Sequence, residues 1–407
     1  MEHVKLTKID IKNYRSCVST VFEPTSTLSA LIGPNGSGKT TVLSAVQLLI
    51  KLQASSNYYR RRSADPYSSD CVISATFKWN GKNVIYKAQI SLINNERNED
   101  EIQAATESWV MPTISGNRKQ LHIPLGALSD DYRYPGRSFR ETLVNHIGNT
   151  TGNQETAEDA TRAIVDISQF ISSISYYSAS VFTNPSSSPI SFEVEGDSMV
   201  RRGGIGVGHK KFLYDLYTAY REDTEDFKNY CDIIGNNGLN LIDQLTFHAI
   251  ETSSSIYKVL VGGRITNREK KTNLIVPNFF IYGNALSPSQ LSEGTFKTLA
   301  LIFYIMTNHG SMLLIEEPEV CVHHGLLSSI IELIKLYSHD KQIIISTHSD
   351  QLIDHIPLES VFKTTRSEET TSVTSIAKEL GSDELRALRE YLQNEGGLGQ
   401  YWKHGEL

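Results

Sequence analysis

The chain of 407 residues is long enough for two or three domains, or for one domain with a large insertion. Hydrophobic residues make up 39% of it and charged residues 21%, which is the balance of a soluble globular protein, and its longest apolar run, residues 299–306, is far too short to span a bilayer. A net charge of −7 excludes a uniformly basic nucleic-acid-binding surface, although it leaves room for a local basic patch.

The cysteines are scattered along the sequence, and no two of them form a Cys-x-x-Cys pair. This distribution predicts a reducing compartment and argues against a cysteine zinc site. No signal-peptide pattern opens the sequence, because a strand-like alternation begins at Val4. We therefore expect a cytoplasmic protein. The four cysteines are Cys17, Cys71, Cys231 and Cys321.

Three strand-like segments come first. Residues 4–11 alternate apolar and polar side chains, the pattern of a half-buried strand, and residues 17–22 form a second such segment. Because the two are separated by a short polar turn, we expect them to form an antiparallel hairpin. The apolar run of residues 28–32 then predicts a short buried strand.

Residues 33–40, Gly-Pro-Asn-Gly-Ser-Gly-Lys-Thr, fit the pattern G-x-x-x-x-G-K-[ST] of a phosphate-binding loop. The buried strand before them and the helical pattern over residues 41–50 supply the context that this motif needs. The glycines allow successive N–H groups to point at one phosphate, and the helix N-terminus adds its positive dipole end. Lys39 would then reach the β- and γ-phosphates, and the Thr40 hydroxyl would ligate Mg²⁺. The alternative is a glycine-rich turn that matches by chance.

The middle of the chain carries weaker signals. Residues 71–79 and 83–92 are strand-like, and Asn80-Gly81 between them is a strong hairpin signal, whereas the acidic residues 94–107 favour an exposed loop. The remaining expected elements are helices over 139–147 and 157–170, a strand over 174–182, one or two helices over 210–245, and strands over 254–261 and 273–281.

Two features of this region have competing interpretations. Arg60, Arg61 and Arg62 could contact nucleic acid or a partner, but a short charge run is more often a solvated loop. The aromatic residues on one face of the helical segment 210–245 could stack on bases, yet core packing explains them better. The glycines of residues 203–208 are no dinucleotide fingerprint, because no strand–helix unit surrounds them.

Acidic residues follow a second buried strand. The apolar run 311–315 stops at Glu316-Glu317-Pro318, and ligands of open α/β sheets bind at such carboxyl ends of strands. One carboxylate can hold Mg²⁺ through water, and the other can polarise the water that attacks a γ-phosphate. A surface acidic turn is the alternative, which Pro318 makes less attractive because it ends the strand at this point.

Two further stretches complete the pattern. Residues 291–297 open a helix with Ser292 as a suitable N-cap, although this helix end could be capped locally and do nothing else. Residues 341–347 form another buried strand, and His348 follows it. Alone, His348 is best explained as a structural or surface residue. Beside the other stretches, it becomes a candidate sensor of the γ-phosphate.

These four stretches, in this order, resemble the ABC-type ATPases of the RecF and SMC branch. They resemble more closely the ATPase domain of OLD-family (overcoming lysogenization defect) proteins and the stand-alone AAA ATPases of bacterial anti-phage defence systems. Residues 9–16 also resemble the first strand and turn of that branch, which implies that Arg15 contributes to nucleotide binding.

The resemblance implies an α/β fold: an ABC-type P-loop NTPase head, with a mixed sheet, flanking helices and an N-terminal antiparallel β-subdomain. A helical insert would separate the Walker A loop from the signature motif. We expect an N-terminal lobe over residues 1–110, a variable and largely helical insert over 111–270, and a C-terminal lobe over 271–407.

The resemblance also assigns roles to residues. It makes residues 33–41 the Walker A loop, 291–297 the signature motif and 312–317 the Walker B strand. Glu317 would be the catalytic base, assisted by His348 of the H-loop and by Lys39, while Thr40 and Glu316 would hold Mg²⁺. The residues implied to bind ATP are Arg15, Gly33, Asn35, Gly36, Ser37, Gly38, Lys39, Thr40, Thr41, Ser292 and Gly294.

The sequence departs from the family pattern in two places. Glu316 stands where many ABC proteins have aspartate, and no clear Q-loop glutamine can be assigned, Gln89 and Gln169 being weak candidates. The stretch after His348 is also too short for the TOPRIM nuclease domain of full OLD-family proteins. We therefore expect any nuclease or toxin activity to reside in a separate effector subunit.

Two copies of such a head would face each other and enclose two ATP molecules, with Ser292 of one copy reaching the γ-phosphate held by the other. The favoured function is the regulatory ATPase of an anti-phage defence system, triggered by DNA or a phage protein and without a membrane partner. The alternatives are a RecF-like DNA repair or DNA-clamping ATPase, a slow-turnover nucleotide-gated scaffold and, more remotely, the nucleotide-binding subunit of a transporter.

Overall fold

The computed structural model describes residues 4–54, 71–94, 100–112, 120–124, 137–195, 198–199, 208–259, 265–307, 310–320, 322, 324–394 and 396–403. The chain packs into two compact units. Unit 1 comprises Met1–Tyr176, His309–Glu317 and Ile334–Leu407, and unit 2 comprises Tyr177–Asn308 and Pro318–Leu333. This division follows the packing of the chain, and the expected three segments with boundaries at 110 and 270 stay a prediction.

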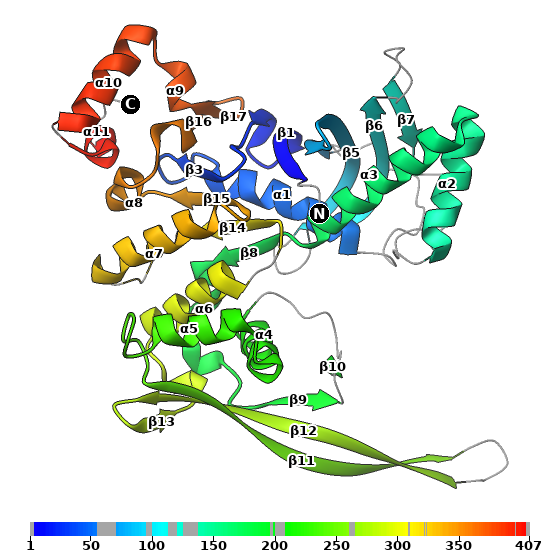
Figure 1. Cartoon of the computed structure of the whole chain (residues 1–407), viewed down its shortest axis with the longest axis vertical. Helices are drawn as coiled ribbons and strands as arrows, with labels where there is room; N and C mark the ends of the chain where they lie inside the picture. Colours follow the sequence, from blue (N-terminus) through cyan, green and yellow to red (C-terminus); the bar gives the residue numbers. More distant parts are fainter. Residues whose placement is uncertain are drawn as a thin grey trace. The chain divides into compact units, whose positions relative to one another are not determined.

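The first sheet of unit 1 has six strands in the order β2-β1-β4-β5-β6-β7, and all neighbours are antiparallel (Figure 1). The expected first hairpin is confirmed by the pairing of Ile9 with Phe22. Asn80 and Gly81 both have positive φ, as the predicted two-residue hairpin turn requires. The strands are β1 (Lys5–Tyr14), β2 (Cys17–Phe22), β4 (Cys71–Trp79), β5 (Lys82–Asn94), β6 (Asp100–Pro112) and β7 (Gln120–Pro124).

The exposed loop expected over residues 94–107 is wrong for residue 94 and for residues 100–107, and residues 95–99 lie outside the described residues. The strand β5 continues to Asn94, and β6 begins at Asp100 and pairs with β5 along its length. Glu107, which contributed to the acidic composition, is only 7% exposed. Composition indicated solvent exposure here, whereas backbone pairing with a neighbouring strand decides the structure.

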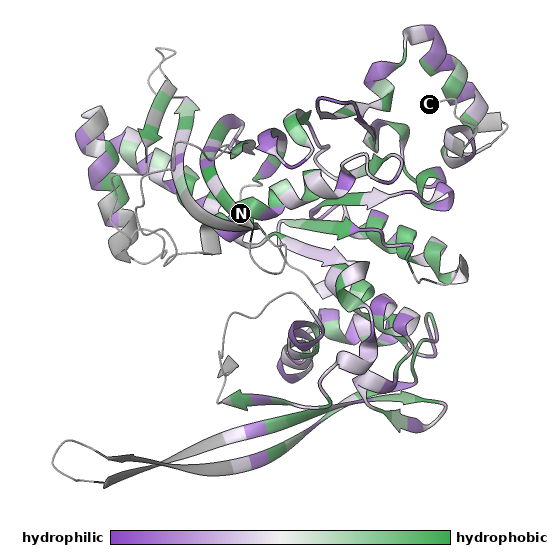
Figure 2. Ribbon diagram, turned by 180° about the vertical axis from the view of Figure 1, so that it is seen from behind, coloured by the Kyte–Doolittle hydropathy of each residue, from purple (hydrophilic) through white to green (hydrophobic). Residues whose placement is uncertain are grey.

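The second sheet of unit 1 is mixed, with the order β17-β16-β3-β15-β14-β8. The strands β14, β15, β3 and β16 run parallel, and β17 is antiparallel to β16. Figure 2 shows the central strands as largely hydrophobic, which agrees with the burial of every residue of β3 and β15. The strands are β3 (Leu28–Ile32), β14 (Met312–Glu316), β15 (Gln342–Thr347), β16 (Val361–Arg366), β17 (Thr371–Ser375) and β8 (Ser175–Ser178), of which β8 begins in unit 1 and ends in unit 2.

One hydrophobic cluster joins the two sheets of unit 1 through α1 and α3. It contains Leu31 and Ile344 from the mixed sheet, Val46 from α1, and Phe77 packed edge-on against Phe170 of α3. The strand expected over residues 174–182 is shorter than predicted, because β8 ends at 178 and a 3-10 helix follows. The helices of unit 1 are α1 (Lys39–Ala54), α2 (Arg137–Thr151), α3 (Gln154–Ser172), α8 (Asp350–Asp354), η5 (Leu358–Ser360), α9 (Ile376–Glu379), α10 (Ser382–Asn394) and α11 (Leu398–Lys403).

Unit 2 contains a sheet in the order β10-β9-β12-β11, with β13 also paired to β12. Its main feature is a long hairpin (Figure 1). The two strands β11 and β12 pair without a register shift, from Gln244 opposite Phe280 to Val259 opposite Ile265. The strands are β9 (Phe192–Glu195), β10 (Ser198–Met199), β11 (Gln244–Val259), β12 (Ile265–Ile281) and β13 (Asn284–Leu286).

The helices of unit 2 share an aromatic core. Phe212 of α4 packs edge-on against Phe296 of α6 at a centroid distance of 5.4 Å and contacts Phe303 at 5.7 Å. Core packing is thus confirmed for Phe212, which is buried beside Leu213 and Leu216, whereas Tyr220 on the same helix is 39% exposed. The helices are η2 (Ala179–Phe182), η3 (Pro185–Ser187), α4 (His209–Glu222), α5 (Glu225–Ile234), η4 (Pro288–Gln290) and α6 (Glu293–Thr307), and α7 (His324–Tyr337) begins in unit 2 and ends in unit 1.

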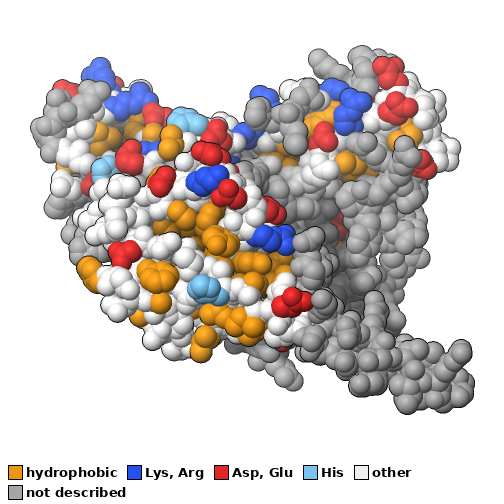
Figure 3. All heavy atoms as spheres, turned by 60° about the horizontal axis from the view of Figure 1, so that its bottom comes forward, with side chains coloured by type: hydrophobic (Ala, Val, Ile, Leu, Met, Phe, Trp, Pro, Cys, Tyr) orange, Lys and Arg blue, Asp and Glu red, His pale blue; other side chains and the backbone are white. Residues whose placement is uncertain are grey.

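Some large hydrophobic residues lie exposed at the surface. Figure 3 shows one face on which hydrophobic side chains lie in patches between charged ones, and Ile250 and Tyr282 are among the large hydrophobic residues most exposed in unit 2, at 51% and 89%. Within the described ranges, every helix is too short or too polar to cross a bilayer.

Candidate functional site

The phosphate-binding loop adopts a backbone that depends on its glycines. Gly33, Gly36 and Gly38 have φ values of 151°, 81° and 106°, a region that side chains rarely adopt. A Cβ atom on Gly33 would lie 2.3 Å from the Thr364 carbonyl oxygen, and one on Gly38 would lie 2.4 Å from Oγ1 of Thr371. The surroundings therefore leave no space for a side chain at Gly33 or Gly38, whereas the space beside Gly36 is open.

Lys39 covers this loop. Its Nζ donates hydrogen bonds to the carbonyl oxygens of Gly33 at 2.7 Å and Pro34 at 3.1 Å, and the residue is only 6% exposed. The hydroxyl of Ser37 is buried and has no hydrogen-bond partner among the described residues. A phosphate group in the loop would offer acceptor oxygens to both groups, so the loop fits the ligand that its sequence predicts.

Two hydroxyl groups anchor the loop to neighbouring elements. Ser16, in the turn between β1 and β2, donates to Oγ1 of Thr41 at 3.3 Å. Oγ1 of Thr371 lies 2.9 Å from the Ser16 hydroxyl and 3.3 Å from the Ser37 carbonyl oxygen. Sequence analysis did not find Thr371, because no pattern marks a threonine that lies far from the loop in the sequence and beside it in the fold.

Arg15 lies in the same turn, directly before Ser16, and has a positive φ of 49°. Its guanidinium carbon is 5.3 Å from the centre of the Tyr14 ring, and the residue is exposed. The turn is thus tied to the phosphate-binding loop through Ser16. A contact between Arg15 and a nucleotide stays a prediction.

Glu316 ends β14 and meets two hydroxyl groups. Its Oε1 accepts a hydrogen bond from Thr40, in the first turn of α1, and its Oε2 accepts one from Tyr176, in β8. The structure therefore brings together the two residues that were predicted to hold Mg²⁺. Sequence analysis missed Tyr176, which no motif marks.

Glu317 and His348 lie at the same end of the sheet. Nδ1 of His348 is 3.9 Å from Oε1 of Glu317. Both side chains are accessible, that of His348 being 49% exposed and that of Glu317 38%. Glu317 has a left-handed backbone with φ 47°, and its N–H donates to the Ser346 carbonyl oxygen at 2.9 Å. Such a conformation costs about 1–2 kcal/mol for a residue with a Cβ, and strained residues of this kind gather at functional sites.

The predicted signature motif lies at the start of α6 in unit 2. Ser292 is the N-cap, since its Oγ accepts the Thr295 N–H at 3.1 Å, and the residue is exposed. Glu293 forms a 2.7 Å ion pair with Lys297, whose side chain is only 2% exposed, and also accepts the Asn184 N–H at 3.3 Å. The motif is therefore fixed on a packed helix that leaves its serine accessible.

Other predicted residues lie elsewhere. Gln89 is in β5 and Gln169 is in α3, so neither belongs to the sheet that carries the candidate site. The arginine run 60–62 and most of the glycine segment 203–208 lie outside the described residues. Asn35 of the phosphate-binding loop is exposed. In the signature motif, the carbonyl oxygen of Gly294 accepts a hydrogen bond from the Thr298 hydroxyl at 2.8 Å.

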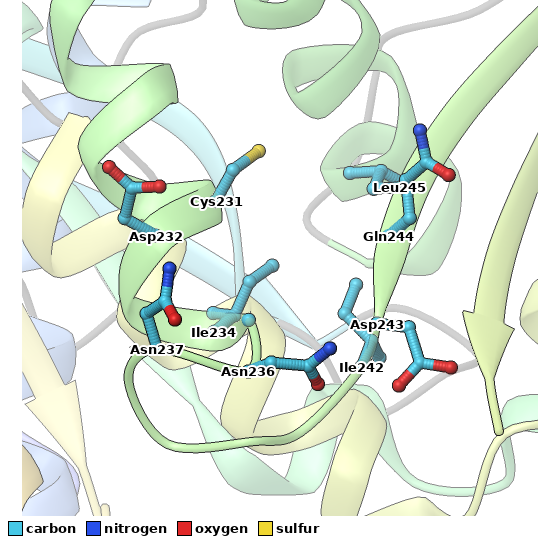
Figure 4. A pocket seen from close by; sticks show the side chains of 10 residues that line it. Cys231, Asp232, Ile234, Asn236, Asn237, Ile242, Asp243, Gln244 and Leu245 are labelled. Carbon is cyan, nitrogen blue, oxygen red and sulfur yellow. The ribbon is translucent and has the colours of Figure 1, made fainter.

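A pocket of about 460 Å³ lies between the end of α5 and the start of β11 in unit 2 (Figure 4). Asp232 and Asn237 line the pocket from the α5 side, and Gln244 lines it from β11. It contains none of the predicted site residues. Burial raises the pKa of its Cys231 to about 11, so that thiol is protonated at neutral pH and is not a nucleophile.

The candidate metal ligands fit magnesium. Among the residues that the structure describes, no group of three or more His, Cys, Asp or Glu side chains gathers as a metal site. Mg²⁺ does not need such a group, because it binds proteins through one or two oxygen ligands and takes its others from phosphates and water. The Thr40 hydroxyl and the Glu316 carboxylate are ligands of this kind.

The phosphate-binding loop lies between a buried strand and a helix, and its threonine donates a hydrogen bond to an acidic residue of a nearby parallel strand. These features define a P-loop NTPase domain. Two family models agree with this class. Residues 4–181 match the family described as "AAA ATPase domain", and residues 260–354 match the family described as "AAA domain, putative AbiEii toxin, Type IV TA system". The two segments that contain the candidate site residues thus match models of AAA-type ATPase domains.

Solved structures give a more distant likeness. The SMC head domain from Thermotoga maritima is 12% identical, with a TM-score of 0.42, and covers 91% of this chain and 99% of that one. A Pyrococcus furiosus Smc head domain bound to the C-terminal domain of ScpA is 11% identical, with a TM-score of 0.45, and covers 95% and 99%. No curated protein matches the sequence.

Proposed function

We propose that the protein binds ATP with Mg²⁺ and hydrolyses it. One observation carries this proposal: the Thr40 hydroxyl of the phosphate-binding loop donates to Glu316 at the end of β14. In a P-loop NTPase, residues at these two positions would hold a magnesium ion, which would supply positive charge beside the phosphates. The neighbouring Glu317 and His348 supply a base and a phosphate contact at the same strand ends.

Each residue has a defined task in this proposal. Lys39 exchanges the carbonyl oxygens of its own loop for phosphate oxygens, and the N–H groups of the loop bind the same phosphates. Thr40 and Glu316 hold the ion, which neutralises charge on the phosphates. Glu317 accepts the proton of the attacking water, and His348 contacts the γ-phosphate.

The proposal extends to a switch made of two copies of the chain. Ser292 is exposed at the N-terminus of α6, where backbone N–H groups and the helix dipole favour an anion. A second copy would present this end to the γ-phosphate and complete the site. ATP then holds the two copies together, and hydrolysis releases them.

The proposed biological role is the regulatory ATPase of an anti-phage defence system with a separate effector subunit. The resemblance to OLD-family and defence ATPases supports it, and one matched family is described as "AAA domain, putative AbiEii toxin, Type IV TA system". This support is by analogy, since folds of one class serve many functions.

The substitution Glu317→Gln tests the hydrolytic assignment. It removes the base and keeps the size of the side chain, so we expect ATP turnover to fall by about 100-fold or more while ATP binding persists. Glu368→Gln, the same chemical change at an exposed residue, is the control. If purified wild type and Glu317→Gln hydrolyse ATP alike, Glu317 is not the base.

A further inference from the structure

We propose that Tyr176 is a positioning residue for the metal side of the ATP site. Its phenol fixes the orientation of the Glu316 carboxylate and thereby sets the affinity of the nucleotide site for Mg²⁺. This inference rests on the proposed function, and it assigns a role to a residue outside every motif in the sequence.

The hydrogen bonds at Glu316 carry the inference. The two oxygens of one carboxylate accept from two hydroxyls, Oε1 from Thr40 and Oε2 from Tyr176. The Tyr176 ring packs against the hydrophobic cluster of unit 1 and is partly buried. Because packing holds the ring, the phenol is a fixed point against which the carboxylate is oriented.

The identity of the acid explains why such a fixed point matters. Glutamate has one more rotatable bond than the aspartate that many ABC proteins use, and fixing a long side chain costs conformational entropy. A carboxylate bonded to Thr40 alone could still rotate about that single contact. The second hydroxyl removes this freedom before any metal binds, as outer-shell hydrogen bonds do at other metal sites.

The arrangement is compatible with a bound ion. A threonine hydroxyl has one hydrogen and two lone pairs, so Thr40 can keep donating to Glu316 while its oxygen ligates Mg²⁺. The carboxylate likewise has lone pairs to spare beyond the bond from Tyr176. Neither hydrogen bond at Glu316 has to break, and the orientation seen here is the one that the ion would meet.

The test compares Tyr176→Phe with wild type in binding of a fluorescent ATP analogue, titrated with Mg²⁺ and repeated in EDTA. Loss of an outer-shell partner typically weakens metal binding by 10–100-fold, and we expect the Mg²⁺ concentration at half-saturation to rise by about tenfold. Binding in EDTA and the melting temperature should not change, because the ring and its packing are kept. Tyr220→Phe, which removes an exposed phenol of α4, is the matched control.

A second comparison separates orientation from a general structural effect. In a Glu316→Gln background, Tyr176→Phe should cause no further change in the Mg²⁺ midpoint, since the two residues act through one contact. An unchanged midpoint in Tyr176→Phe, or an equal loss of binding with and without Mg²⁺, overturns the inference while the proposed function stands. If wild type itself binds no nucleotide, the proposed function fails, and this inference fails with it.

Discussion

At the scale of single residues, the site combines a few unusual backbone conformations with ordinary hydrogen bonds. Gly38 has a φ of 106°, and Glu317 adopts a left-handed conformation directly before a proline. Thr371 leaves no space for a Cβ at Gly38, and Glu317 is held by its hydrogen bond to Ser346. These positions should therefore tolerate substitution poorly.

The substitution Gly38→Ala tests this point. The new methyl group would lie 2.4 Å from Oγ1 of Thr371, and alanine disfavours this backbone, so we expect a loss of about 1–3 kcal/mol of unfolding free energy. ATP binding should fall at least tenfold because the loop must shift. Gly81 also has a positive φ, of 74°, but a Cβ atom at this position would meet open space. The variant Gly81→Ala should therefore lose stability and still bind ATP normally. Normal ATP binding by Gly38→Ala would count against this loop as the phosphate site.

Sequence patterns predicted some site residues and missed others for physical reasons. Lys39, Thr40 and Glu316 follow from short motifs at strand ends, and the structure joins Thr40 to Glu316 by a hydrogen bond while Lys39 bonds within its own loop. Tyr176 and Thr371 contact the same site only because the mixed sheet brings distant segments together. Local patterns record local geometry, so contacts of that kind leave no signal in a single sequence.

At the scale of elements, hydrophobic runs identified the buried strands well. The strands β3, β14 and β15 were expected from apolar runs, and burial on both faces explains why such runs are continuous. The strand β6 was missed, because the composition of its first part is polar. Pairing with β5 holds this strand, and backbone pairing does not depend on apolar side chains.

The helix α6 offers a prediction at this scale. Glu293→Gln would leave the buried Lys297 ammonium without its carboxylate, and we expect a loss of about 2 kcal/mol in urea denaturation, less than for a fully buried pair because Glu293 is 40% exposed. The double variant Glu293→Gln/Lys297→Met should be less destabilised than the single variant, since the buried ammonium is removed together with its carboxylate. If the single and double variants are destabilised equally, loss of the ion pair does not explain the loss of unfolding free energy in Glu293→Gln.

At the scale of the whole molecule, the candidate residues are divided between the two units. The phosphate-binding loop, Glu316, Glu317 and His348 belong to unit 1, and Ser292 belongs to unit 2. In the proposed switch, a complete site takes its loop from one copy and its serine from another. The competing DNA-clamping function predicts instead that ATP strengthens duplex binding with a steep salt dependence, which the net charge of −7 does not favour.

The most direct test mixes two inactive variants, Lys39→Ala and Ser292→Arg, and measures ATP turnover. In a mixed dimer, one site combines an intact loop from one variant with an intact serine from the other. With random pairing in a two-fold dimer, about a quarter of the sites are restored, so the mixture should recover about a quarter of wild-type turnover. If the mixture hydrolyses no more ATP than the two variants do separately, Ser292 does not act on a neighbouring copy and the proposed switch is wrong.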